Sequence, residues 1–320
     1  MAVVGNGILT VLKFIAFGIS GSGAMFSEAI HSAADTGNQA LLWVGIRRSQ
    51  AVPSAVFPYG LGVERFFFAL LSAIGIFVLG CGFTLYHGVH MLMDPHLADP
   101  GWIDYTVLGI SFVIDGVILK KAIGIVNQKR GKQGFVAYLR SSSDPTLLAV
   151  LAEDGIACLG VLIALGGILL AKATSSHYPD AIATLMIAGL LGAIAVWIGW
   201  KNRTLLLGPG LAPARQAEVV AFLEQQPTVE RIKVARSRLL GADRYRLHVE
   251  VDWDGRVLGD AQTEWVESQS ARLDTAEGRA TFAREFGERM TEAVGDEVDR
   301  LEVLMRERFP ELSHLELESE

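Results

Sequence analysis

Six long apolar segments fill the chain up to about residue 204 and constrain its fold more than any other feature. A helix needs about 20 residues to cross about 30 Å of hydrocarbon. Each segment is near or above that length, so the sequence predicts an α-helical membrane protein with six transmembrane helices. The expected spans are residues 2–20, 24–46, 65–93, 102–126, 146–172 and 179–200.

The composition changes near residue 204, and this change predicts two domains. The 320 residues are 51% hydrophobic and their mean hydropathy is +0.35, which is high for a soluble protein. Beyond the last apolar segment the chain becomes charged, as in a water-soluble domain. We therefore expect a transmembrane domain over residues 1–204 and a C-terminal soluble domain over residues 205–320.

The basic residues of the loops predict the orientation of the helices. The loops after the second and fourth spans are rich in Lys and Arg, whereas the opposite loops, "GSG", "DPHLADPGW" and "KATSSHYPD", hold a single Lys. Because such residues are in excess on the cytoplasmic side, we expect both termini and the soluble domain in the cytoplasm. The membrane would be the cell inner membrane in a prokaryote. The basic loop residues are Arg47, Arg48, Arg65, Lys129, Arg130, Lys132 and Arg140.

Charge and cysteine content exclude some classes of function. The net charge is -7, and its acidic excess lies mostly in the tail, which disfavours nucleic acid as a partner. Cys81 and Cys158 are the only cysteines and lie in separate apolar segments. No disulfide framework is predicted.

Hydrophobic periodicity predicts a small α+β fold for the tail. Residues 213–226 have helical spacing, and residues 228–241 and 244–255 alternate like strands. A long charged helix is expected over residues 276–308, and residues 312–318 alternate again. The order α-β-β-α-β suggests a sheet with helices on one face.

The second span carries a polar stripe that a lipid-facing helix would not tolerate. Glu28, His31, Asp35 and Asn38 are offset by 3, 7 and 10 residues, so they share one side of a helix. That side must face another helix or a polar cavity. His31 and Asp35, four residues apart, can bind one metal ion together; a hydrogen-bonded contact between helices is the alternative.

The fifth span offers a second set of acids. Glu153 and Asp154 are adjacent and point about 100° apart. Asp154, with Cys158 four residues on, is the preferred ligand carrier, and Glu153 is a second ligand, a proton carrier or the partner of Lys13. At 1.5 Å per residue, the His31–Asp35 pair and Asp154 both lie about 10–18 Å below the outer surface. They therefore meet near the midplane, where transporters bind substrate.

Further polar residues have weaker functional interpretations. Asp115 in the fourth span is a proton relay, an outer-shell ligand or an ion-pair partner of Lys13, and Asn6 shares a face with Lys13 as a structural partner. Two groups of potential ligands could bind metal, although interfacial histidines and solvated strand faces are common. These groups are His87, His90 and His96 near the outer end of the third span, and His248, Glu250, Asp252 and His314 in the tail.

Together these features resemble the cation diffusion facilitator family, which includes the zinc transporters. Two stretches of the sequence are similar to the zinc-transporter-nine-like branch: "GSGAMFSEAIHSAADTGNQALLWVGIRRS" and, after it, "PYGLGVERFFFALLSAIGIFVLGCGFTLYHG". The resemblance implies export of a divalent cation, most simply Zn²⁺, in exchange for protons. It also implies a homodimer in the bilayer and a tail with a ferredoxin-like, metallochaperone-like fold.

The chain departs from the family pattern at one ligand position. Many relatives have a histidine four residues before the fifth-span aspartate, where this chain has Val150. Glu153, Asp115, Asn38 or a water molecule could supply the missing ligand. One imidazole with several oxygens suits Zn²⁺ but also Mn²⁺, Fe²⁺ or Co²⁺.

Metal–proton antiport has three alternatives: a metal sensor or scaffold, a monovalent-cation antiporter and an intramembrane hydrolase. A metal sensor or scaffold that does not transport is compatible with the absent histidine. Carboxylates alone would serve a monovalent-cation antiporter, but His31 favours a transition metal. An enzyme is not expected, because no GxSxG, HExxH or other nucleophile–base pair is present.

Overall fold

Long helices occupy all six apolar segments of the computed structural model, which describes residues 2–20, 23–94, 102–141 and 145–319. The side chains of several helical residues, among them Glu28 and His31, are outside this description. The helices are α1 (Ala2–Ser20), α2 (Gly23–Ser49), α3 (Glu64–Gly75) continued by η1 (Ile76–Gly82) and α4 (Phe83–Met93), α5 (Trp102–Lys129), α7 (Pro145–Thr174) and α8 (Tyr178–Leu206). A short helix, α6 (Phe135–Ser141), lies in the loop after α5.

Three of the described helices have the length and apolar composition that crossing a membrane requires: Glu64–Met93, Leu147–Thr174 and Tyr178–Leu206. A shorter apolar stretch, Asn6–Ile15, lies in α1. Six crossings therefore remain a prediction, with α1, α2 and α5 as the remaining candidates. The helical composition and the apolar surface are those of a membrane domain.

These helices bury small residues between them and expose large apolar residues on their outer faces. Four of the buried residues of α8 are alanines, whereas Met186, Val196 and Trp200 are exposed. At Gly167 of α7 a Cβ atom would lie 2.6 Å from Cβ of Ala183 in α8. Membrane helices pack through such small residues because lipid provides no hydrophobic drive for their association.

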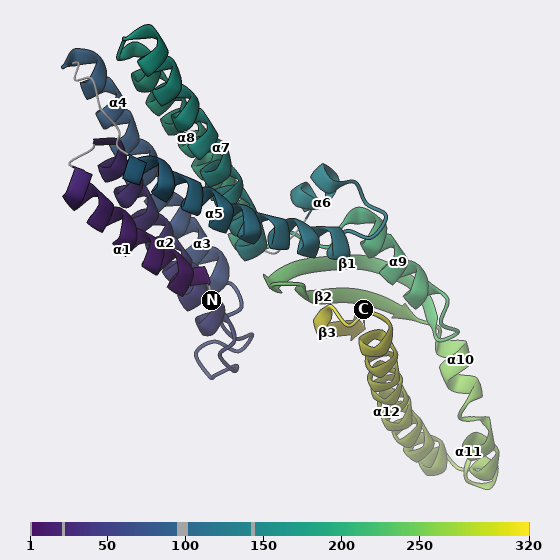
Figure 1. Cartoon of the computed structure of the whole chain (residues 1–320). Helices are drawn as coiled ribbons and strands as arrows, with labels where there is room; N and C mark the ends of the chain where they lie inside the picture. The colour runs from purple at the N-terminus through teal and green to yellow at the C-terminus, as the bar shows by residue number, and fades with distance from the viewer. Residues whose placement is uncertain (1, 21–22, 95–101, 142–144, 320) are drawn as a thin grey trace. The chain divides into compact units, whose positions relative to one another are not determined.

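The helices of this unit, Met1–Leu207, pack so that α7 lies near both α2 and α5. In Figure 1, α1 runs beside α2, and α2 packs on α3. Helix α8 packs on α3, η1, α4 and α7, while α5 contacts α7 and α1. A buried cluster of apolar residues from α2, α3, η1, α7 and α8 fixes the centre: Leu42, Ala69, Ala73, Ile76, Ala149, Leu191, Ala195 and Ile198.

The third apolar segment contains a π-helical stretch, η1, that the sequence did not predict. It interrupts the α-helical hydrogen bonds between α3 and α4. Such widened turns inside α-helices occur frequently at functional sites. Here the stretch packs against α8, where Leu191 Cδ1 lies 3.6 Å from the Cβ position of Gly80.

The second unit, Gly208–Glu320, is an α+β fold around a three-stranded sheet. Its elements in chain order are α9 (Pro213–Glu224), β1 (Val229–Gly241), β2 (Arg244–Trp253), α10 (Gly255–Asp260), α11 (Thr263–Ser268), η2 (Ser270–Arg272), α12 (Ala276–Arg308) and β3 (Leu312–Ser319). Strand β2 is central, antiparallel to β1 and parallel to β3. The α+β character of the tail is as predicted, whereas α10, α11 and η2 were not expected.

The alternation of β2 gives the sheet two different faces. Leu247, Val249 and Val251 are fully buried and pack into one core with residues of α9 and of the end of α12. Arg246, His248 and Glu250 occupy the opposite, polar face, as alternation requires. Only the last turns of α12 enter the core, through Leu301 and Met305, and its first half runs beside α10 and α11 (Figure 1).

Candidate functional site

The polar stripe of α2 faces other helices wherever the structure describes it. Glu28 and His31 are helical, but their side chains lie outside the described part of the chain. Asp35 is half-buried and Asn38 is buried. Oδ1 of Asn38 would lie 2.9 Å from a Cβ atom at Gly75 of α3, so the stripe packs closely on α3.

Both acids of α7 are buried. The exposed fractions of Glu153 and Asp154 are 8% and 4%. Among the described residues, neither carboxylate oxygen of Glu153 has a hydrogen-bond partner, and Oδ2 of Asp154 also has none. Burying an ionised carboxylate without partners costs several kcal/mol. These two groups therefore require a proton or a bound cation.

Carboxylates from three helices act on one another at this place. The charges of Asp35 on α2 and Asp154 act on Glu153. Those of Asp115 on α5 and Asp35 act on Asp154. Asp115 is itself buried, with 9% exposed. The structure thus brings together four of the acids that the sequence singled out, and their mutual repulsion favours a cation among them.

These carboxylates surround a common region without forming a closed set of ligands. Within the described residues, no three of them have ligand atoms within 4.8 Å of one another. The half-buried Cys158 lies within reach of the charges of Asp115 and Asp154. Val150 lies one turn before Asp154 on α7 and is half-buried. The position at which many relatives have a histidine therefore offers no metal ligand in this chain.

A second polar stripe of α2 faces α1. Lys13 of α1, 3% exposed, donates a hydrogen bond from Nζ to Oγ of Ser32 at 2.7 Å. Hydroxyl oxygens of Thr10 and Thr36 lie 3.0 Å apart. Sequence reasoning missed Ser32 and Thr36, although each follows a residue of the first stripe by one position and so points about 100° away from it.

The outer histidines do not form a metal site in the described structure. His87 and His90 lie in α4, and His96 lies outside the described residues. No third ligand joins His87 and His90 within the part of the chain that is described.

Asn6 of α1, which the sequence interpretation paired with Lys13, is buried, and its backbone carbonyl accepts a hydrogen bond from the hydroxyl of Thr10.

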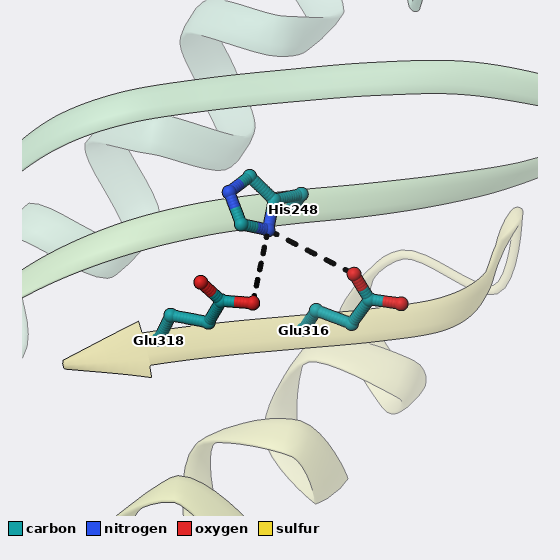
Figure 2. A group of neighbouring side chains, drawn as sticks. All are labelled: His248, Glu316 and Glu318. Carbon is teal, nitrogen blue, oxygen red and sulfur yellow. Dashed lines mark ion pairs between the residues drawn. The ribbon is translucent and has the colours of Figure 1, made fainter.

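The polar face of the C-terminal sheet carries a compact histidine–glutamate group (Figure 2). Nδ1 of His248 lies 3.8 Å from Oε2 of Glu316 and 3.7 Å from Oε1 of Glu318. Among the described residues, these three form the one group of at least three potential ligands within 4.8 Å of one another. Parallel pairing of β2 with β3 produces it, since His248 is opposite Glu316 in the register.

The tail residues named from the sequence are only partly brought together. Glu250 Oε1 lies 3.6 Å from Nε2 of His248, whereas Asp252 pairs with Arg231 at 3.1 Å. Nδ1 of His314 lies 3.1 Å from the hydroxyl of Ser313. Glu316 and Glu318 were missed, although the alternation of residues 312–318 places them on one strand face.

Neighbouring arginines adjust the charges on this sheet face. A hydrogen bond from Arg246 lowers the pKa of Glu316, which is therefore ionised at neutral pH. Burial and then the charge of Arg244 lower the pKa of His314, so its imidazole is neutral at pH 7. Arg246 already neutralises part of the acidic charge that a metal ion would need.

Comparison with known proteins places the chain in a family. The cation efflux transmembrane domain family matches residues 1–207. The chain is 34% identical over 325 residues to the proton-coupled zinc antiporter SLC30A9, mitochondrial, of Xenopus laevis, covering 99% of this chain and 58% of that protein. The chain is also 34% identical to the human protein of the same name, and the match covers 99% of this chain and 57% of the human protein. Metal tolerance protein C4 of Arabidopsis thaliana is 31% identical to this chain, and the match covers 98% of this chain and 71% of the Arabidopsis protein.

These similarities extend over both units and confirm the resemblance inferred from the polar stripe and the loop sequences. The chain spans somewhat over half the length of the SLC30A9 proteins that it matches. The family is one of membrane transporters and not of enzymes. The chain belongs to the cation efflux, or cation diffusion facilitator, family, in the zinc-transporter-nine-like branch.

Proposed function

We propose that this protein is a secondary active transporter that exports a divalent transition metal, Zn²⁺ foremost, from the cytoplasm in exchange for protons. One observation carries the proposal: the adjacent buried acids Glu153 and Asp154, with unpartnered oxygens, lie within reach of the charge of Asp35. The names of the SLC30A9 relatives, which are proton-coupled zinc antiporters, support this metal and this counter-ion.

The proposed ligands are His31 and Asp35 of α2 with Asp154 of α7. Glu153 takes the fourth position, in place of the histidine that Val150 replaces. Zn²⁺ accepts such a mixture of imidazole and carboxylate ligands in a four-coordinate arrangement. Glu28, Asn38, Asp115 and Cys158 are more distant candidates, and Mn²⁺, Fe²⁺ and Co²⁺ are alternative substrates because oxygen ligands dominate the set.

Coupling follows from competition between the metal ion and protons for the same groups. Metal binding needs a neutral His31 and ionised carboxylates, so metal binding releases protons. Protons that enter from the outside neutralise the carboxylates and expel the ion, and their loss to the cytoplasm restores the site. Movement of the ligand-bearing helices then alternates access to the site. A homodimer with both termini in the cytoplasm completes the proposal.

Zinc uptake into proteoliposomes tests the proposal. Asp35→Asn removes a proposed ligand and should abolish zinc-gradient-driven transport, whereas the wild type transports. Asp180→Asn is the matched control, because Asp180 lies in the first turn of α8 and is not a proposed ligand. Equal transport by the Asp35 variant and the wild type would reject the site, and parallel assays with Mn²⁺, Fe²⁺ and Co²⁺ rank the substrates.

A second candidate function is metal sensing by the C-terminal unit, and the group of His248, Glu316 and Glu318 favours it. His248→Ala should remove one zinc ion per chain from the purified protein, whereas His314→Ala should leave the stoichiometry unchanged. Zinc binding without zinc flux in the wild type would favour a sensor or scaffold over a transporter.

A further inference from the structure

Lys13 is the one basic side chain that is buried within the described residues of the N-terminal unit. A Lys ammonium group is rarely placed inside a membrane domain, because desolvating it costs several kcal/mol. It donates a hydrogen bond from Nζ to the buried hydroxyl of Ser32 at 2.7 Å. Neither the proposed ligand set nor the proton exchange described above uses this group.

The hydrogen bond to Ser32 places the positive charge beside the carboxylates. Ser32 precedes Asp35 by three residues on α2, and side chains at that spacing are helix neighbours, about 5–6 Å apart at Cβ. The ammonium group is thus within about 12 Å of the Asp35 carboxylate. Helix α1 also contacts α5, the helix that carries Asp115.

The neighbouring contacts hold the charge in place. One turn along the same interface, Thr10 and Thr36 hydroxyls lie 3.0 Å apart, and Thr36 also donates to the carbonyl of Ser32 at 2.8 Å. These bonds fix α1 against α2 at the level of Lys13. The charge is therefore held at the interface of α1 and α2, one helix turn from Asp35.

We infer that Lys13 is an internal counter-cation that sets how tightly the metal is held and how fast it leaves. Its charge compensates part of the carboxylate cluster once the metal has gone, and it repels the divalent ion while the metal is bound. At about 12 Å and an effective dielectric constant of about 20, this repulsion weakens the binding of a divalent ion by at least tenfold. Lys13 is thus a positioning charge and not a ligand. The inference rests on the proposed transport function.

The test compares zinc affinity with maximal transport rate in the full-length protein. Lys13→Gln keeps a hydrogen-bond donor for Ser32 but loses the charge. It should bind zinc about tenfold more tightly and transport more slowly at saturating zinc, because release is slower. Lys13→Arg should restore both values. A lysine that is only structural would lower affinity and rate together, or neither.

Controls separate charge from packing. Thr10→Val breaks the hydroxyl contact at the same helix interface without removing the charge, and its zinc affinity should change much less than that of Lys13→Gln. Should Lys13→Gln fail to fold, Lys13→Met provides the uncharged side chain of similar length. Unchanged or weaker zinc binding by the uncharged variants, with normal binding by the wild type, overturns the inference alone. Absence of zinc binding by the wild type overturns the proposed function as well.

Discussion

Asn38 of α2 and Gly75 of α3 lie in direct contact: a Cβ atom at Gly75 would be 2.9 Å from Oδ1 of Asn38. The two helices approach closely enough that only glycine fits without displacing the amide. This contact ties the proposed metal-binding helix to the segment that continues into the π-helical stretch η1. The position of the polar stripe thus depends on a residue that carries no side chain.

Replacing Gly75 by alanine should displace Asn38 and strain the packing of α2 on α3. We expect a loss of about 1 kcal/mol in stability, at the low end for overpacked sites because the crowded atom is the end of the Asn38 side chain, together with slower zinc transport. Thermal unfolding of the purified protein measures the first effect. Gly109→Ala in α5 is the control, since nothing lies within 4 Å of its Cβ position. Equal melting temperatures for the two variants would contradict this prediction.

Neutralising the buried acids should separate activity from stability. Glu153→Gln and Asp154→Asn keep the side-chain shape and remove a buried charge; among the described residues, both oxygens of Glu153 and Oδ2 of Asp154 lack a hydrogen-bond partner. Transport should fall at least tenfold, whereas the melting temperature should stay or rise, because the desolvation cost of the charge disappears. If both variants unfold at lower temperature in proportion to their lost activity, the acids are structural.

Val150→His should complete an i, i+4 histidine–aspartate pair with Asp154. We expect about tenfold tighter binding of Zn²⁺ and a smaller gain for Mn²⁺, because Mn²⁺ prefers oxygen ligands. Isothermal titration with each metal provides the comparison, and Val150→Asn controls for added polarity. No gain for the histidine variant would show that position 150 does not face the ion.

Acid should weaken the C-terminal unit through Glu297. A hydrogen bond from Arg300 lowers the pKa of this carboxyl, burial opposes the shift, and a bond from Thr228 adds to it. The pKa of Glu297 is therefore lower in the folded state than in the unfolded state, where it has the ordinary value of 4.5. The stabilisation is fully present above pH 4.5, and it is lost as the pH falls through the lower pKa of the folded state.

Glu297→Gln should therefore cost about 1 kcal/mol at pH 7 and progressively less below pH 4.5. Urea unfolding of residues 208–320, which have their own core, measures it. Glu307→Gln, at an exposed site of α12, should change stability by less than about 0.5 kcal/mol at either pH. A pH-independent loss for the Glu297 variant would contradict the assignment.

Periodicity predicted the regular elements of the tail well, because alternation and helical spacing are local signals. The strand over residues 244–255 and the helix over residues 276–308 appear as β2 and α12. The helices α10 and α11 were missed because each has six residues, too few for a clear period. The π-helical turn of η1 has no sequence pattern that the hydropathy of the span would reveal.

The candidate site was predictable where one helix carries the whole signal, as in the stripe containing Asp35 and Asn38. Contacts between elements were harder to anticipate. The meeting of His248 with Glu316 and Glu318 depends on parallel pairing across the long α12, and that of Lys13 with Ser32 depends on how two helices rotate against each other. Neither rotation nor register is encoded by spacing within a single segment.

Simultaneous recording of zinc and proton movement in proteoliposomes tests the central claim most directly. With an internal pH dye and a zinc gradient across the membrane, the wild type should move protons against the zinc flux, and Asp154→Asn should abolish both movements together. Zinc flux that persists in this variant, or that proceeds in the wild type without any proton counter-movement, would contradict the account.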